Sequence, residues 1–429
     1  MRVILVPVVA LLAGLPVAVQ ASPPAAPAVK LGIDVLIDQG FKPLAGRRVG
    51  LITNPTGVTG DLRSTIDVLH AAPNVELVAL FGPEHGVRGD AHAGDPVGDT
   101  RDARTGLAVY SLYGRNRKPS PDILADLDVL VFDIQDIGSR SYTYISTMAV
   151  AMEAAAEHGV RFVVLDRPNP LGGVRIEGRP LDLKYRSFVG YLPIPYVHGL
   201  TVGELARMIN GRGWLDAAVA SDKKVEGDGV AGALRCDLTV VPLTGWKRAM
   251  GWADTGLHWV PTSPHIPRAE SALHYAATGI MGELRVIDEG VGYTLPFELA
   301  GAPWIDPILL ADALNARGLT GVNFRPIYYR PYYSTFAGRT CGGVQIVLTD
   351  PKQVRLTPIQ FHVMDVVRSK YTDRPLFGKK RDGMFDKVCG SDRVRRMFLD
   401  GRPIGEILAF WNEGVEAFRT ARAEYLLYD

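Results

Sequence analysis

In the first half of the chain, hydrophobic positions gather into short runs that polar and glycine-rich segments separate. Runs rich in β-branched residues and bounded by turn residues are typical of β-strands, and they occur at residues 47–53, 75–81, 107–113, 127–134, 160–166 and 238–246. Residues 144–159 follow a helical pattern that stops at Gly159, as a helix C-terminus does. Strands that are apolar on both faces and alternate with helices predict a parallel sheet covered on both sides.

The pattern changes after the sixth run. Three prolines within residues 258–271 exclude regular structure there, so we place a domain boundary in this stretch. Farther on, the pattern predicts helices at 306–317, 358–371 and 404–427 and strands at 322–329 and 342–350. The chain is therefore predicted to form an α/β domain over residues 31–260 and a smaller α+β domain over residues 270–429, and its length also favours two domains.

The N-terminus has the pattern of a secretory signal peptide. One arginine precedes a short apolar run that ends in small residues, which predicts cleavage after Ala21. A membrane anchor is the alternative, but Pro7 and Pro16 interrupt a run that is barely long enough to span a bilayer. Residues 22–30 read as a Pro/Ala-rich leader. We expect a soluble, exported protein, periplasmic or extracellular, with no membrane segment after cleavage of residues 1–21.

Charge and cysteine content exclude several classes of function. The 47 Lys and Arg residues nearly balance 46 Asp and Glu residues, and no basic run stands out, so we expect no nucleic-acid partner. The three cysteines include no CxxC pair and cannot form a disulfide framework or a thiolate metal site. The chain lacks G-x-G-x-x-G after the first strand, a G-K-[ST] loop and G-x-S-x-G, which argues against a nucleotide-dependent enzyme and a serine hydrolase.

Polar loops follow several predicted strands, where parallel sheets bind their ligands. The loop "GPEHGVRGD" offers Glu84 and His85 for acid–base catalysis, with Arg88 close behind. The alternative is a turn with a solvated acid. His85, Asp90, His92 and Asp95 could supply metal ligands, but their spacing matches no common metal motif, so we expect no metal site.

Two further loops offer groups that suit a sugar or an anionic ligand. The segment "DIQDIGSRSYTY" supplies Gln135, Asp136, Arg140 and Tyr142, which combine hydroxyl partners, a possible carboxylate clamp and a stacking face. The alternative for the tyrosines is packing at a helix start. Asn169 in "DRPNP" and His198 before Gly199 are further candidates, and His198 could instead be a core histidine. Thr201 and Glu204 form a capping box, which gives Glu204 a structural role.

Six segments, "GPEHGVRG", "YSLYG", "FDIQDIGSRSYTYI", "DRPNPLGG", "GLTVGELA" and "EGVGYTLPFELAGAPW", occur in this order along the chain. Together they resemble a family long catalogued as a domain of unknown function, whose characterised members are exo-β-N-acetylmuramidases (NamZ-type, glycoside hydrolase family 171). The resemblance runs from about residue 31 to the C-terminus. It implies a Rossmann-like N-terminal domain, a smaller C-terminal domain and an active site in the cleft between them. It also implies release of N-acetylmuramic acid from non-reducing ends of peptidoglycan fragments without a cofactor.

The resemblance places the catalytic glutamate at Glu84 and adds Glu289 from the second domain. It implies that the pocket is lined by His85, Arg88, Gln135, Asp136, Arg140, Tyr142, Asn169 and His198. The lactyl carboxylate of muramic acid needs a cationic partner, for which Arg88 and Arg140 are the candidates. The second catalytic group stays open between Glu289, as nucleophile or base, and the substrate's acetamido oxygen oriented by Asp136. A muropeptide-binding protein and a metal-dependent hydrolase are the alternative functions.

Overall fold

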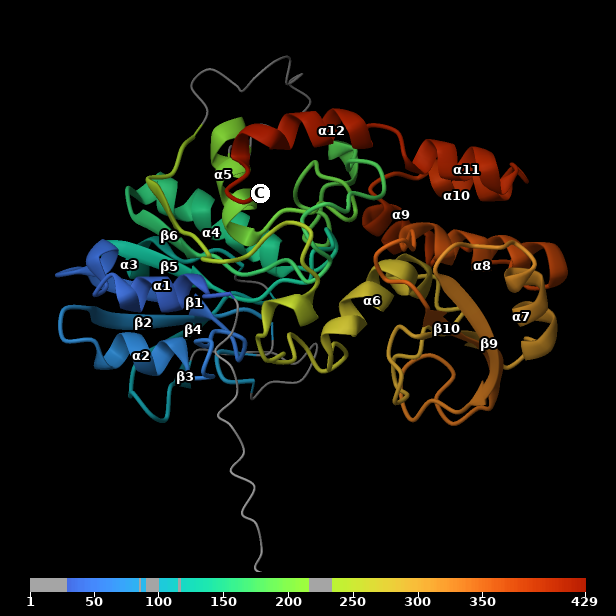
Figure 1. Cartoon of the computed structure of the whole chain (residues 1–429), viewed down its shortest axis with the longest axis horizontal. Helices are drawn as coiled ribbons and strands as arrows, with labels where there is room; N and C mark the ends of the chain where they lie inside the picture. The colour runs from blue at the N-terminus through green and yellow to red at the C-terminus, as the bar shows by residue number, and fades with distance from the viewer. Residues whose placement is uncertain (1–28, 85, 90–99, 115–116, 216–233) are drawn as a thin grey trace, which may run out of the picture.

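The structure, a computed structural model, describes residues 29–84, 86–89, 100–114, 117–215 and 234–429. The expected signal peptide, most of the expected leader and His85 lie outside these residues. Figure 1 shows two domains side by side along the longest axis of the molecule. In the described part of the chain, no helix combines the length and apolar character that a membrane span requires.

The first domain is built on a seven-stranded sheet in the order β3-β4-β2-β1-β5-β6-β7, in which only β3 runs antiparallel to its neighbour. Its strands are β1 (Arg48–Thr53), β2 (Glu76–Gly82), β3 (Thr100–Arg101), β4 (Ala108–Ser111), β5 (Val129–Asp133), β6 (Arg161–Leu165) and β7 (Leu238–Val241). Each of the six predicted runs contains one of these strands or, for β2, all but its last residue, so the predicted α/β class is confirmed. The two-residue β3 was not predicted because it is too short to show a period.

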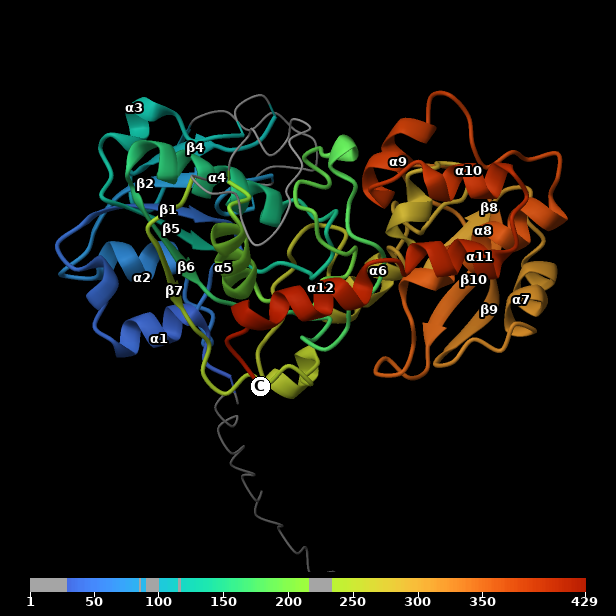
Figure 2. The ribbon, with the colours of Figure 1, turned by 90° about the horizontal axis from the view of Figure 1, so that it is seen from above.

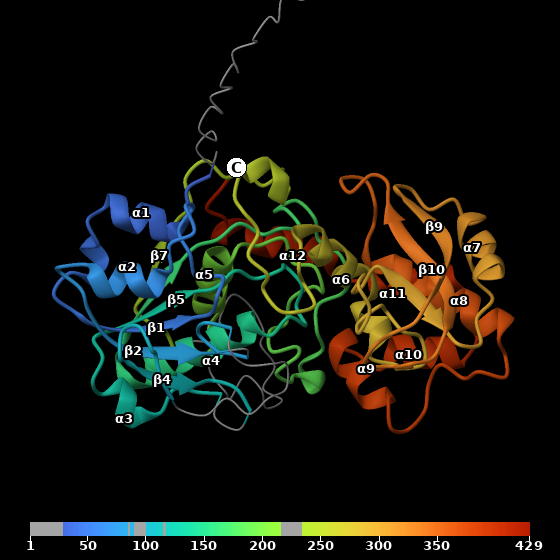
Figure 3. The same ribbon diagram turned by 90° about the horizontal axis from the view of Figure 1, so that it is seen from below.

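Helices cover both faces of this sheet. They are α1 (Gly32–Asp38), α2 (Thr65–Ala71), α3 (Pro121–Leu124), α4 (Tyr144–His158) and α5 (Val202–Arg212). Figures 2 and 3 show α1 and α2 on one side of the strands and α3 and α4 on the other. Within β1, Val49 and Leu51 belong to one apolar core and Ile52 to the other. Strands buried on both faces have few polar positions, which explains why the runs were readable from sequence.

The second domain packs helices on a small antiparallel sheet in the order β8-β10-β9. Its elements are α6 (Ala269–Gly282), β8 (Leu299–Ala302), α7 (Pro307–Asn315), β9 (Val322–Tyr329), β10 (Cys341–Leu348), α8 (Thr357–Lys370), α9 (Asp382–Cys389) and α10 (Arg393–Leu399). The apolar core of this domain continues into Ile137 and Tyr196 of the first domain, and both side chains are fully buried. The two domains therefore share one hydrophobic contact region.

The prediction of one helix over residues 404–427 is wrong. The segment forms α11 (Ile404–Trp411), α12 (Val415–Arg422) and the 3-10 turn η5 (Ala423–Tyr425). The break falls at Gly414, whose φ of 81° lies in the left-handed region that glycine adopts without strain. After this break the chain returns to the first domain, where Phe418 packs in the core beside α4 and α5 and the Tyr428 hydroxyl donates to Asp166 at 2.5 Å.

Candidate active site

Loops of the first domain leave the sheet at its carboxyl edge, and the strand register places them next to one another. Gly82 at the end of β2 pairs with Ser111 at the end of β4. On the other side of β2 lies β1, whose Thr53 pairs with Asp133 at the end of β5. The chain order reverses at β1, so this edge is the switch point at which α/β sheets bind ligands.

Glu84 lies just beyond β2, half-buried, beside two tyrosines. The pKa of the Tyr113 hydroxyl is raised by burial, then by the charge of Glu84 and by a hydrogen bond with its carboxylate. Burial also raises the pKa of the Tyr144 hydroxyl, and the charges of Glu84 and Asp136 add to that effect. The charges of both carboxyl groups therefore act on the Tyr144 hydroxyl. This arrangement brings three of the strand-end loops to one place.

Asp136 is a buried carboxyl group, 5% exposed, in the loop after β5. Its Oδ2 accepts a 2.7 Å hydrogen bond from the Gly138 N–H, whereas its Oδ1 has no partner among the described residues. Burial raises the pKa of this carboxyl to about 7, and the backbone N–H groups of Gly138 and Ile137 act in the opposite direction. Buried polar atoms are normally satisfied and perturbed carboxyl groups gather at functional sites, so Asp136 stands out as a candidate functional group.

Tyrosine hydroxyl groups connect the loop that carries Asp136 to the segment that leads into the second domain. Tyr142 donates to the Thr262 hydroxyl at 2.8 Å, and Tyr144 donates to the Thr262 carbonyl at 2.5 Å. The Ser141 hydroxyl lies 3.0 Å from the hydroxyl of Tyr275 in α6. The rings of Tyr142 and Tyr275 pack edge to face with centroids 5.7 Å apart. The site is thus positioned by both domains.

Glu289 belongs to the second domain and packs against α6, where a Cβ added to Gly282 would lie 2.7 Å from its Cδ. The side chain is half-buried. Burial raises the pKa of its carboxyl to about 8, and the neighbouring Asp288 charge raises it further. A carboxyl that stays protonated near neutral pH can donate a proton or a hydrogen bond.

Arg88 does not meet the expectation of a free carboxylate clamp. Its guanidinium group donates to Asp102 at 2.5 and 3.0 Å and to Asp67 at 2.9 Å. These two carboxylates raise the pKa of Arg88, and the Arg88 hydrogen bond lowers the pKa of Asp102. The charge of Arg88 is therefore already balanced within the protein.

Arg140 is also excluded as a clamp, because it is 0% exposed and bonded at the domain junction. Its guanidinium group donates to the carbonyls of Arg179 and Ile194 in the first domain, at 2.9 and 2.7 Å. It also donates to those of Val388 and Cys389 in the second domain, at 3.0 and 2.8 Å. Arg140 thus joins the two domains, and its guanidinium group has no exposed surface with which to contact a substrate.

Asn169 and His198 are part of the interior. Asn169 accepts from the Leu171 N–H and donates to the Leu200 carbonyl, both at 2.9 Å. His198 is 1% exposed, and its Nδ1 accepts from the Leu200 N–H at 3.2 Å. Burial, together with the charges of Arg422 and Arg140, lowers the pKa of His198 to about 3, so the ring is neutral. The alternative of a core histidine is the one that this geometry supports.

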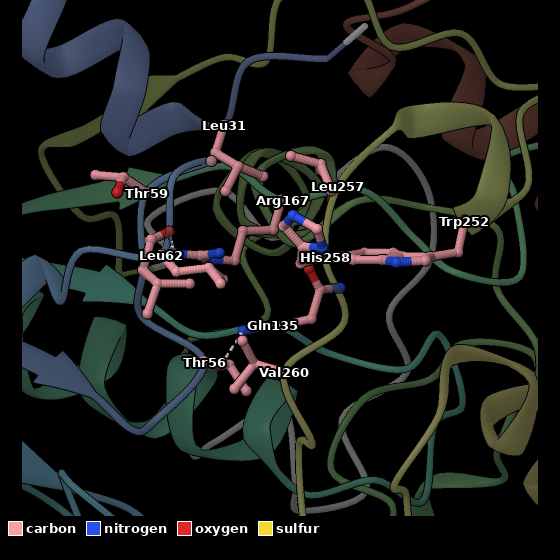
Figure 4. Close-up of a pocket in the computed structure, with 12 residues that line it drawn as sticks. Leu31, Thr56, Thr59, Leu62, Gln135, Arg167, Trp252, Leu257, His258 and Val260 are labelled. Carbon is pink, nitrogen blue, oxygen red and sulfur yellow. Dashed lines mark hydrogen bonds between the residues drawn. The ribbon is translucent and has the colours of Figure 1, made fainter. Parts of the chain in front are cut away.

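Gln135 lines a small cavity of about 20 Å³, which Figure 4 shows. Its Nε2 donates to the carbonyls of Asp136 and Pro168, at 2.8 and 2.7 Å. Figure 4 also shows Arg167 and His258 beside it. The cavity has room for about one water molecule, so it cannot hold a sugar. A wider hollow of about 660 Å³ lies at the domain junction, lined by Arg175, Trp252 and other residues of both domains.

Sequence reasoning did not single out several residues that the structure places at the site. These are Asn54 after β1, Tyr113 after β4, Thr262 in the proline-rich segment and Tyr275 in α6. The position of Tyr113 directly after a predicted strand was an available signal. The four residues considered as metal ligands (His85, Asp90, His92 and Asp95) lie outside the described residues, and the described ones contain no group of three or more His, Cys, Asp or Glu suited to a metal ion.

Comparison with known proteins adds independent information. The model of the N-terminal part of exo-β-N-acetylmuramidase NamZ matches residues 49–270, and the model of its C-terminal part matches residues 273–428. The chain belongs to the NamZ family. It is 44% identical over 402 residues to the peptidoglycan β-N-acetylmuramidase NamZ of Bacillus subtilis strain 168, covering 94% of this chain and 92% of that one.

Two solved structures from Bacteroides fragilis NCTC 9343, both described as DUF1343 family proteins, share the architecture of this NamZ family member. One has a TM-score of 0.86 at 50% identity, and the other has a TM-score of 0.71 at 30% identity. Each alignment covers 94% of this chain and 99% of the solved chain. The two-domain fold with its α/β first domain is therefore that of the NamZ family.

Proposed function

We propose that this protein is an exo-acting glycoside hydrolase that releases N-acetylmuramic acid from the non-reducing ends of peptidoglycan fragments. Membership of the NamZ family and the near full-length similarity to the Bacillus subtilis enzyme support this function. The structural observation that carries it is the presence of two carboxyl groups at the carboxyl edge of the sheet, Glu84 after β2 and Asp136 after β5, the two strands that flank β1. Two carboxyl groups are what most glycosidases use at the scissile bond.

In this mechanism Glu84 is the general acid. It donates its proton to the glycosidic oxygen while the bond from that oxygen to C1 of muramic acid breaks. The acetamido oxygen of the same sugar attacks C1, and the Asp136 carboxyl orients the acetamido group. Water then attacks C1, Glu84 takes up the proton from this water, and the sugar is released. Glu289 is the alternative to Asp136 as the second catalytic group. In that case the second domain, which carries Glu289, would form the side of the site opposite Glu84.

Location favours Asp136 over Glu289 for the second role. Asp136 and Glu84 both follow strands that flank β1, and the charges of both act on the Tyr144 hydroxyl, whereas Glu289 packs against α6 in the second domain. A muropeptide-binding protein without turnover is less well supported, because a binding site for an anionic sugar gains little from buried carboxyl groups.

Turnover of 4-nitrophenyl β-N-acetylmuraminide by the purified protein tests the function. Glu84→Gln keeps the shape of the side chain but cannot donate the proton, so it should retain little activity on a disaccharide substrate. Glu76→Gln is the matched control, since Glu76 is exposed at the other end of β2. No turnover by the wild-type protein would refute the enzymatic proposal.

We also propose export of the protein after cleavage near Ser22. The apolar N-terminal run that ends Val19-Gln20-Ala21 supports this proposal, and peptidoglycan fragments are extracytoplasmic substrates. N-terminal sequencing of the protein from the periplasm or the medium should start near Ser22. An intact Met1 on protein found only in the cytosol would refute it.

A further inference from the structure

N-acetylmuramic acid differs from N-acetylglucosamine by a lactyl group that carries a carboxylate. A site that selects muramic acid therefore needs a cation near Glu84 that is not already paired. Arg88 is held by Asp102 and Asp67, and Arg140 is bonded to four backbone carbonyls. The two cations that the sequence suggested are both occupied, so the recognition must come from elsewhere.

The loop after β4 carries another cation, Arg117, and the loop after the neighbouring strand β2 carries Glu84. Gly82 pairs with Ser111, and the Leu112 N–H donates to the Gly82 carbonyl at 2.8 Å, so the two strands end together. The segments that follow them therefore start side by side. Arg117 lies on this loop beyond Tyr113. Burial raises the pKa of the Tyr113 hydroxyl, the negative charge of Glu84 raises it further, and the positive charge of Arg117 lowers it.

Arg117 is exposed, and its guanidinium group lies over an aromatic ring. Its Cζ lies 4.3 Å from the centroid of the Phe188 ring. In the described ranges no carboxylate forms an ion pair with it, whereas the next residue, Lys118, has Glu153 at 3.0 Å and Glu157 at 2.7 Å. Stacking on a ring fixes the plane of a guanidinium group and leaves its N–H edge available for a bidentate bond.

We propose that Arg117 determines the specificity of the enzyme by binding the lactyl carboxylate of muramic acid. This inference rests on the proposed function. The Phe188 ring orients the guanidinium group, and the paired ends of β2 and β4 start the two loops that carry Glu84 and Arg117. A muramic acid whose lactyl group is amidated by a peptide lacks the charge, so Arg117 favours peptide-free muramic acid.

The test compares three 4-nitrophenyl β-glycosides: N-acetylmuramic acid, its lactyl methylamide and N-acetylglucosamine. Arg117→Ala should lower kcat/KM at least about tenfold on N-acetylmuramic acid, mainly through KM, because a charge-assisted bidentate pair is lost. The other two glycosides lack the carboxylate and should change less than about threefold. Arg117→Lys should restore part of the loss, and Phe188→Leu should lower kcat/KM on N-acetylmuramic acid alone.

Arg339→Ala is the matched control, because Arg339 is an exposed arginine over the ring of Phe336 in the second domain. It should leave all three substrates unchanged, and the unfolding midpoint of each variant should stay at the wild-type value. An equal effect of Arg117→Ala on all three glycosides, or no effect, overturns the inference and leaves the function intact. A wild-type protein that hydrolyses none of them overturns the function and the inference with it.

Discussion

Replacing Asp136 by asparagine tests whether this buried carboxyl keeps its proton in the folded protein up to about pH 7. The ordinary pKa of an aspartate is 3.8, and burial raises that of Asp136 to about 7. At about 1.4 kcal/mol per pKa unit, the ionised carboxyl destabilises the folded protein by about 4 kcal/mol above pH 7. Asparagine keeps the acceptor for the Gly138 N–H and has no charge, so the variant avoids this cost.

The sign of the effect depends on pH. In the unfolded chain the carboxyl loses its proton near pH 4, whereas in the folded protein it keeps the proton until about pH 7. The cost is therefore absent below pH 4, grows between pH 4 and pH 7, and is constant above. The new amide N–H₂ would occupy the place of Oδ1, which has no partner among the described residues, at a cost of about 1–3 kcal/mol at every pH.

We therefore expect Asp136→Asn to be less stable than the wild-type protein by about 1–3 kcal/mol near pH 4 and more stable by a similar amount at pH 8. Urea unfolding of both proteins at pH 4, 5, 6, 7 and 8 measures the difference. Asp128→Asn is the control with the opposite sign, since its hydrogen bond from the Arg48 N–H lowers the pKa of Asp128. A difference in stability that is independent of pH would refute the assignment of a buried, protonated carboxyl at position 136.

Three further predictions concern catalysis and the domain junction. Glu84→Gln should lower kcat at least about 100-fold on a disaccharide and much less on a 4-nitrophenyl glycoside, whose leaving group needs no proton; equal rates of both proteins on both substrates would contradict this role. Arg140→Met leaves four buried carbonyls without their donor and should lower the free energy of unfolding by about 3–5 kcal/mol. Arg63 is an exposed arginine, so Arg63→Met should change the free energy of unfolding by less than about 0.5 kcal/mol. Tyr428→Phe removes the hydroxyl that is hydrogen-bonded to Asp166 and to the Leu243 N–H. Urea unfolding should show that the free energy of unfolding falls by about 1–2 kcal/mol. An unchanged midpoint would show that the hydroxyl of this C-terminal tyrosine does not stabilise the first domain.

The sequence allowed most of the sheet to be predicted, because strands buried on both faces leave uninterrupted apolar runs. The start of α5 was readable for a local reason: the Thr201 hydroxyl accepts from the Glu204 N–H at 3.2 Å, and the Glu204 carboxylate accepts from the Thr201 N–H at 3.1 Å. The break at Gly414 was not readable. Both flanking segments are helical, and glycine inside a helical pattern is tolerated often enough to hide a boundary.

The candidate site was predictable only in part. Glu84 and Asp136 stand in loops after strands, and that position alone points to the carboxyl edge of the sheet. Arg88 and Arg140 occupy similar positions, but their partners are distant in sequence: Asp102 for the first, and the carbonyls of Val388 and Cys389 for the second. A charged residue beside a strand end looks the same in sequence whether it faces a substrate or a buried carbonyl, so only the fold distinguishes the two.

The segment after β5, which carries Asp136, also forms hydrogen bonds between the two domains. The geometry of the site therefore depends on the domain junction. Arg140 lies between Asp136 and Tyr142 and donates to the second domain, while Tyr142 donates to Thr262. Farther along the junction, the Glu177 carboxylate accepts from the Thr357 N–H at 2.8 Å and so caps α8 from the first domain. These bonds hold the walls of the site in one arrangement before any substrate arrives. Catalysis depends on reacting groups held within fractions of an ångström, and these bonds across the junction favour one fixed arrangement of the groups that the two domains contribute.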